Sequence, residues 1–166
     1  MDAIAAFNEV LLGTDQDELV SLGSFEREAS LDVLLTDDSL NYDEITDTVA
    51  EIRPFGGTAI GKGLLETIPS LIAAGSGARP FAKKTVVILT DGEENQEPFA
   101  NTVAQQIVAN DDVQIHTVTF TDGAAQTPMK TVAATGNGKH YHANSGEELI
   151  DIFREIANNL PTIITD

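Results

Sequence analysis

The sequence predicts an α/β fold in three layers, with a doubly wound, mostly parallel sheet that carries one antiparallel hairpin. Three observations predict it. Short apolar runs alternate with stretches of helical periodicity along the whole chain. Val86 to Leu89 form an unbroken, largely β-branched run, which is typical of a strand buried on both faces by helices. Hydrophobic residues make up 42% of 166 residues, enough for one well-packed core, so we expect a single domain over residues 1–166.

The predicted elements begin with a helix, where an alternating strand–helix fold would begin with a strand. Leu19 to Phe25 and Ala29 to Leu35 are predicted to form an antiparallel hairpin across a polar connection. The predicted helices cover 2–12, 41–52, 59–73, 99–109, 128–134 and a last stretch that follows Ser145, and the remaining predicted strands cover 85–90, 113–120 and 139–143. Residues 162–166 are expected to be a terminal strand or a linker.

Local signals mark the ends of several of these helices. Asn41 with Glu44, and Ser145 with Glu148, have the spacing of a capping box. Gly61 and Gly63 lie near the start of the helix at 59–73, where small residues allow another segment of backbone to approach closely.

Composition excludes several classes of function. The 27 acidic residues against 9 basic ones give a formal charge of -18, which opposes binding to nucleic acid or to anionic membranes. The absence of cysteine excludes disulfides and thiolate sites. No apolar run approaches the ~20 residues that span a bilayer, and residues 1–13 do not resemble a signal peptide. The chain is therefore expected to be cytosolic, or to be extracellular, cell-surface or periplasmic if it is a piece of a longer exported protein.

Asp91 is the first candidate for a functional residue. It follows the apolar run at the point where a parallel strand ends, and ligands of open α/β sheets bind beyond such strand ends. The alternative is that Asp91 and Gly92 only make the turn. Glu93 and Glu94 could add to the negative electrostatic potential around Asp91, although as loop residues they are expected to be solvated.

Several segments, in this order, resemble a von Willebrand factor A domain, a Rossmann-like fold, of the type found in bacterial surface and pilus-associated proteins. The resemblance covers the chain from its first helix to Pro161. The segments are LVSLGSF, ASLDVLLTDD, EIRPFGGTAIGKGL, KKTVVILTDGEEN, VQIHTVTFTDG and GKHYHANSGEELIDIFREIANNLP.

The resemblance implies a non-enzymatic module that binds a protein partner through a metal-ion-dependent adhesion site. In that family a divalent cation, usually Mg²⁺, is held by an Asp-x-Ser-x-Ser loop, a threonine and an aspartate, and an acidic side chain of the partner completes the shell. Thr58 matches the threonine and Asp91 matches the aspartate. The alternative for Thr58 is an ordinary helix N-cap.

The chain departs from the family pattern because the first strand and its Asp-x-Ser-x-Ser loop have no counterpart. Asp37 to Asn41 only echo that motif, and Ser21 and Ser24 are better interpreted as strand residues. Two protein ligands are too few for high Mg²⁺ affinity, so we expect the site to be impaired or unfilled in this chain.

The missing strand also has a structural consequence. In the family it lies between the hairpin and the strand at 85–90, so its absence leaves two rows of backbone groups unpaired at roughly 1–3 kcal/mol for each group. We therefore expect the gap to be filled by a strand of another copy, by an upstream segment or by residues 162–166, or else closed by movement of the hairpin. Self-association is one of these outcomes.

Other functions remain as alternatives. His140 and His142 point to one face of a strand and His116 lies on another, but zinc requires three or four ligands, and no further ligand has convincing spacing. Asp91 could be the nucleophile of a phosphoacceptor domain. Such domains carry a lysine at a later strand end, however, where this chain has Thr121-Asp122-Gly123. A scaffold that assembles without metal is a third possibility.

Overall fold

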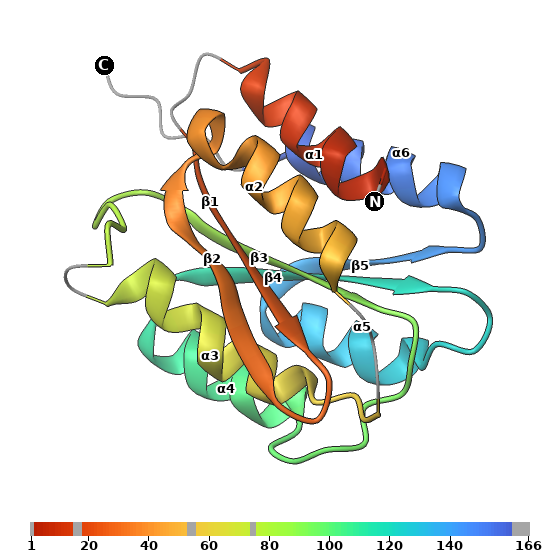
Figure 1. Cartoon of the computed structure of the whole chain (residues 1–166). Coiled ribbons are helices and arrows are strands. Elements are labelled where there is room, and N and C mark those ends of the chain that lie inside the picture. Colours follow the sequence, from red (N-terminus) through yellow and green to blue (C-terminus); the bar gives the residue numbers. More distant parts are fainter. Residues whose placement is uncertain (1, 15–17, 53–55, 74–75, 161–166) are drawn as a thin grey trace.

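The structure is a computed structural model that describes residues 2–14, 18–52, 56–73 and 76–160 (Figure 1). The predicted residues 162–166 lie outside the described part. The order of elements agrees with the prediction, and their bounds are α1 Asp2–Leu12, β1 Leu19–Phe25, β2 Ala29–Asp37, α2 Asp38–Glu51, α3 Ile60–Ile72, β3 Lys84–Thr90, α4 Ala100–Asn110, β4 Val113–Phe120, α5 Gln126–Thr135, β5 Asn137–Ala143 and α6 Gly146–Asn158.

The strands form two separate sheets. The β1–β2 hairpin is antiparallel, as predicted, and β3, β4 and β5 form a parallel sheet in that order. Helices α3, α4 and α5 lie on one side of the parallel sheet, and α1 and α6 lie on the other (Figure 1). The predicted α/β fold in three layers is therefore confirmed.

Strand β3 contributes to the core on both of its faces, because successive side chains of a strand point in opposite directions. Val86 and Ile88 pack into the cluster of α3, α4 and α5. Val87 and Leu89 pack against the cluster of α1 and α6. The predicted contact with helices on both faces is confirmed.

Burial of β3 is less complete than the sequence predicted. Only Ile88 of the run from Val86 to Leu89 is buried, and the other three side chains are half-buried. The reason is that β3 is the edge strand of its sheet and pairs with β4 alone, while β1 pairs with β2 in a separate sheet. Within the described residues, no strand pairing joins β1 to β3. The hairpin has not moved across to close this gap.

One predicted cap is wrong and one is confirmed. Helix α2 begins at Asp38, so Asn41 lies inside the helix and cannot be its N-cap. Strand β2 runs to Asp37, two residues further than predicted, so no loop remains between these elements. At α6, in contrast, Ser145 is the N-cap, and its hydroxyl accepts a hydrogen bond from the Glu148 backbone at 3.2 Å. The Glu148 carboxylate accepts from the backbone of Asn144 at 2.8 Å, one residue before the position that a full capping box uses.

The glycines at the start of α3 allow close approach, as predicted. A Cβ on Gly61 would lie 1.9 Å from the carbonyl oxygen of Pro98, and a Cβ on Gly63 would lie 3.0 Å from the ring of Phe25. Gly61 therefore lets the loop after β3 pack directly on the first turn of α3. Among the described residues, no helix has the length and apolar character needed to cross a membrane.

Candidate functional site

Thr58 and Asp91 come from different loops that meet at the carboxyl end of β3. Thr58 is half-buried in the loop before α3, and Asp91 is exposed directly after β3. The Thr58 Oγ1 atom lies 3.1 Å from the position that a Cβ on Gly92 would occupy. Both residues also line the same cavity. The structure therefore brings the two predicted ligand positions together.

Thr58 is not the N-cap of α3. The cap is Ala59, whose side chain accepts no hydrogen bond, and the helix begins one residue later. The prediction that Thr58 is an ordinary N-cap is therefore wrong, and its hydroxyl does not cap the start of α3.

Two hydrogen bonds tie the loop of Thr58 to the loop after β3. The Thr58 backbone N–H donates to Asn95 Oδ1, and the Asn95 backbone N–H donates to the Thr58 carbonyl, each at 3.0 Å. The separation between Thr58 and the turn at Asp91 is therefore held by direct contacts between the two loops.

Glu94 fixes this arrangement further, although the sequence predicted a solvated residue. Its carboxylate accepts hydrogen bonds from the backbone N–H of Gly61 at 2.8 Å and of Ala100 at 2.8 and 3.0 Å. It thus satisfies orphan donors at the first turns of both α3 and α4. Burial raises the pKa of Glu94 above its usual value, and the hydrogen bonds from Ala100, Gly61 and Ile60 oppose the rise.

A signal for this role was present in the sequence. Helices α3 and α4 begin after Ala59 and Phe99, and neither residue can cap a helix with its side chain. Neither helix has an acidic residue in its first turn. Two uncapped helix starts require an acceptor from elsewhere in the chain, and Glu94 is that acceptor.

The donor atoms fit a hard divalent cation in kind but not in number. A threonine hydroxyl and an aspartate carboxylate are oxygen ligands of the type that Mg²⁺ prefers. Within the described ranges, however, no three His, Cys, Asp or Glu side chains form a group that could hold a metal. Thr58 and Asp91 can therefore supply only part of a coordination shell.

The serines near the site belong to the hairpin, as the sequence predicted. Ser24 Oγ lies 3.3 Å from Ser30 Oγ across the hairpin, and Ser21 Oγ lies 3.4 Å from Ser70 Oγ on α3. Both are strand residues of β1. They join β1 to its neighbours and do not replace the absent Asp-x-Ser-x-Ser loop.

The histidines make structural contacts. His140 Nδ1 lies 2.9 Å from Thr117 Oγ1, and His142 Nδ1 lies 2.9 Å from Thr119 Oγ1. His116 Nδ1 accepts from the Lys139 backbone at 3.1 Å. Burial lowers the pKa of both His116 and His140. These hydrogen bonds explain the polar side chains between β4 and β5 without a metal.

The strand end next to Asp91 lacks the lysine of a phosphoacceptor domain. Strand β4 is the neighbour of β3, and Thr121, Asp122 and Gly123 follow it directly. Asp122 is exposed, and this stretch adds a second carboxylate where a phosphoryl group would require a positive charge. The arrangement disfavours phosphoryl chemistry at Asp91.

Comparison with known proteins identifies a family and a shared fold. The family model of the von Willebrand factor type A domain matches residues 2–155. No curated protein matches the chain at a significant level. The solved structures described below are 15–18% identical to the chain, a level at which the likeness shows the fold alone.

Three of these structures illustrate the range of sources. A von Willebrand factor type A protein from Catenulispora acidiphila has a TM-score of 0.75 at 15% identity, over 94% of this chain and 36% of that one. An aerotolerance-related membrane protein from Bacteroides fragilis has a TM-score of 0.72 at 18% identity, over 96% and 88%. Proximal thread matrix protein 1 from the mussel byssus, with a zinc-occupied MIDAS motif, has a TM-score of 0.68 at 16% identity, over 93% and 40%. The chain thus spans well under half the length of the first and third of these proteins.

Proposed function

Because the chain belongs to the von Willebrand factor type A family, we propose that it is a non-enzymatic module that binds a protein partner through a divalent cation at Thr58 and Asp91. Domains of this family are in general interaction modules. A mussel byssus protein of the same fold has a zinc-occupied MIDAS motif, which supports a divalent cation as the ligand of this fold. The single observation that carries the proposal is the closeness of the Thr58 hydroxyl to Gly92, which follows Asp91 in the turn: a Cβ on Gly92 would lie 3.1 Å from Thr58 Oγ1.

The two residues have separate roles in this proposal. Exposed Asp91 supplies the negative charge that attracts the cation, and half-buried Thr58 supplies a neutral oxygen held by the bonds to Asn95. A bound cation would offer a positive charge to which an acidic side chain of a partner can bind. Because Mg²⁺ keeps several water ligands, two protein ligands give weak binding, and we propose that the site is impaired in residues 1–166.

A Mg²⁺ titration followed by thermal denaturation tests the site. A ligand that binds the native state raises its melting temperature, and ten times Kd corresponds to a rise of about 3–6 °C for a domain of this size. Because the site is weak, we expect only part of this rise at millimolar Mg²⁺, an increase as the Mg²⁺ concentration is raised further, and its loss in Asp91→Ala. Asp122→Ala is the matched control, since Asp122 is an exposed aspartate at the next strand end.

Two results would contradict this proposal. Equal Mg²⁺ responses of wild type, Asp91→Ala and Asp122→Ala would mean that the cation screens the acidic surface without a specific site. A stable phosphoryl adduct on Asp91 after incubation with acetyl phosphate would favour a phosphoacceptor domain.

A further inference from the structure

The helices on the two sides of the protein differ in charge. Helices α1, α2 and α6 together contain eleven acidic residues and one basic residue, a formal charge of -10. Helices α3, α4 and α5, on the opposite side in Figure 1, contain one acidic residue and two basic ones, a formal charge of +1. More than half of the net charge of -18 therefore lies on one helix layer, and the other layer is nearly neutral.

The exposed side of α4 and α5 lacks the charges that a helix facing solvent normally carries. In the 11 residues of α4 and the 10 of α5 only Lys130 is charged, whereas the chain average of 22% would give about five. The side chains of α4 that point away from the core are Thr102, Gln105 and Ala109, at positions i, i+3 and i+7 of one helix face. Depletion of charged residues is typical of the centre of a protein–protein interface, because a charge there loses its water.

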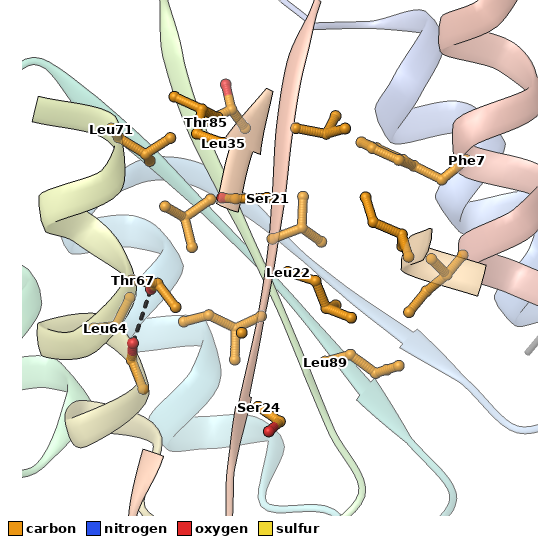
Figure 2. A pocket seen from close by; sticks show the side chains of 18 of the residues that line it. Phe7, Ser21, Leu22, Ser24, Leu35, Leu64, Thr67, Leu71, Thr85 and Leu89 are labelled. Carbon is orange, nitrogen blue, oxygen red and sulfur yellow. Dashed lines mark hydrogen bonds between the residues drawn. The ribbon is translucent and has the colours of Figure 1, made fainter. Parts of the chain in front are cut away.

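Helix α3 extends this uncharged surface with exposed apolar side chains. Leu64, Thr67 and Leu71 point toward the hairpin (Figure 2), so the opposite side of the helix faces outward. Leu65 and Ile72 lie on that outer side and are 49% and 37% accessible. Helix α4 packs between α3 and α5, so the exposed side chains of the three helices form one surface, which we call the α3–α5 face.

A carboxylate lies at one rim of the α3–α5 face. Glu66 is exposed and is one helical turn from Ser70, whose hydroxyl lies 3.4 Å from that of Ser21 on the hairpin. Glu66 is therefore on the side of α3 that is turned away from α4. It takes part in none of the ion pairs of the described residues.

A lysine lies at the other rim. Thr135 Oγ1 of α5 donates to Asn101 Oδ1 of α4 at 3.1 Å, which identifies the side of α5 that faces α4. Burial and the nearby charge of Lys130 lower the pKa of His140 on β5, so Lys130 lies on the other side of α5. Lys130 is exposed and, like Glu66, has no ion-pair partner within the described ranges.

We propose that the α3–α5 face is the interface of a homodimer, in which a two-fold axis parallel to α4 brings α4 of one copy against α4 of the other. This symmetry places α3 of each copy opposite α5 of the other, so Glu66 of one copy faces Lys130 of the other at both rims. Uncharged side chains then fill the centre and paired charges lie at the rim, which is the usual arrangement of a protein interface.

Charge favours a second copy as the occupant of this face. A basic partner is drawn to the acidic helix layer, and an acidic partner is repelled by the molecule as a whole. A second copy presents an uncharged surface whose two rim charges have complementary positions. The acidic layers of the two copies stay apart, because each lies two layer spacings of roughly 10 Å behind the interface, beyond the Debye length of ~8 Å at physiological salt.

The α3–α5 face is large enough for a specific dimer. Its helices have 10 to 13 residues and are therefore about 15–20 Å long. Three helices side by side at axis spacings of about 8–10 Å are ~30 Å wide. Two such faces in contact bury roughly 1,000 Å² in total, which is near the lower limit for a specific interface. We therefore expect a dimer of moderate affinity that dissociates on dilution.

The dimer also determines where the two candidate cation sites lie. Helix α4 begins beside the loop of Asp91, because Glu94 of that loop accepts from the Ala100 backbone at 2.8 Å. An axis parallel to α4 keeps this end of both copies on the same side of the dimer. If the proposed function holds, two weak sites then face one partner surface together, and bivalent attachment raises the overall affinity without any new contact.

Sedimentation equilibrium in about 0.15 M NaCl with EDTA tests the dimer. We expect the mean mass to rise from that of one chain toward that of two between about 10 and 500 µM protein. Glu66→Lys places like charges opposite each other at both rims, as does Lys130→Glu, and each is expected to weaken the dimer by about tenfold or more. The double variant exchanges the two charges, and we expect it to recover wild-type affinity to within about threefold.

Two further variants examine the centre of the interface and the effect of net charge. Gln105→Glu is nearly isosteric and places carboxylates of both copies near the axis, so we expect it to weaken the dimer by about tenfold or more. Glu9→Lys is the matched control for Glu66→Lys, because it makes the same change in net charge at an exposed position of α1. We expect Glu9→Lys to leave the dimer unchanged.

Four results would overturn the proposal. The mass of a single chain at about 500 µM would show that no dimer forms. A dimer that is indifferent to Glu66→Lys and Gln105→Glu would have its interface elsewhere. A double variant as weak as the single ones would contradict the placement of α3 opposite α5, and equal weakening by Glu9→Lys would indicate an effect of net charge alone. None of these measurements uses Mg²⁺ or Asp91, so failure here leaves the proposed cation site untouched.

Discussion

Replacing Glu94 with alanine tests how the candidate site is held together. The Glu94 carboxylate is half-buried and accepts from the backbone of Gly61 and Ala100, at the first turns of α3 and α4. The substitution leaves both helix starts without their acceptor. It also releases the loop after β3, on which Asp91 and Asn95 lie, from the helix that follows Thr58.

The magnitude follows from the two helix starts. Loss of one N-terminal acceptor costs typically ~1 kcal/mol, and hydrogen bonds to a charged group contribute about 1.5–3 kcal/mol. Two such losses give roughly 2–6 kcal/mol. Burial of the charge opposes this stabilisation, as the raised pKa of Glu94 shows, so we expect the lower end, about 2 kcal/mol. That free energy corresponds to a fall in melting temperature of roughly 4–8 °C.

Urea denaturation at pH 7 measures the effect, with exposed Glu93→Ala as the matched control. Surface substitutions such as Glu93→Ala are expected to change the free energy of unfolding by no more than ~0.5 kcal/mol. A Glu94→Ala effect as small as that of Glu93→Ala would refute the role of Glu94 as a shared acceptor for two helices.

The pH dependence gives a second check on Glu94. Its pKa is higher in the folded state than in the unfolded state, so between the two values the folded protein binds more protons. The contribution of Glu94 to stability is therefore full below the unfolded pKa and decreases as pH rises through the folded pKa. We expect Glu94→Ala to cost more near pH 4 than at pH 7, and the opposite trend would show that hydrogen bonding outweighs burial.

Three further predictions follow from single sites. Gly61→Ala places a methyl group against the backbone of Pro98, and we expect it to destabilise the protein by roughly 1–3 kcal/mol or more in urea denaturation. The control is Gly146→Ala, which adds a methyl group in open space and is expected to stabilise α6 by up to ~1 kcal/mol. Burial lowers the pKa of His116 in the folded state, so the free energy of unfolding falls as pH drops below about 6.5. We expect His116→Gln to reduce this dependence on pH, measured by unfolding curves at pH 5 to 7. Removal of Mg²⁺ with EDTA should return the melting temperature of wild type to that of Asp91→Ala, and a persistent difference would indicate that Asp91 stabilises the fold without metal.

Much of the candidate site could be predicted from local patterns. Asp91 follows an apolar strand, and its place at the strand end depends only on where that strand stops. Thr58 was found through a family motif, because nothing in its own neighbourhood distinguishes a ligand from an N-cap. The structure bears only on the N-cap, which it excludes by placing the start of α3 after Ala59.

Glu94 was misjudged for a different reason. Its neighbours in the sequence are polar, which favours a solvated loop, and its partners at Gly61 and Ala100 are 33 and 6 residues away. Asn41 was misjudged because the helix begins earlier than its capping pattern suggests. Both errors concern polar groups whose partner depends on which segments meet.

The amino-acid sequence by itself determined the alternation of strands and helices, the hairpin, the acidic composition and the place of Asp91 at a strand end, because each depends on composition, on periodicity or on residues adjacent in the chain. Tertiary structure decided that the hairpin stays apart from the parallel sheet and that a groove separates β1 from β3. The physical reason is that the hairpin and β3 both pack against α3, while backbone pairing joins each of them to a different strand. Whether an edge is paired depends on what lies beside it, and periodicity along one segment carries no information about that neighbour.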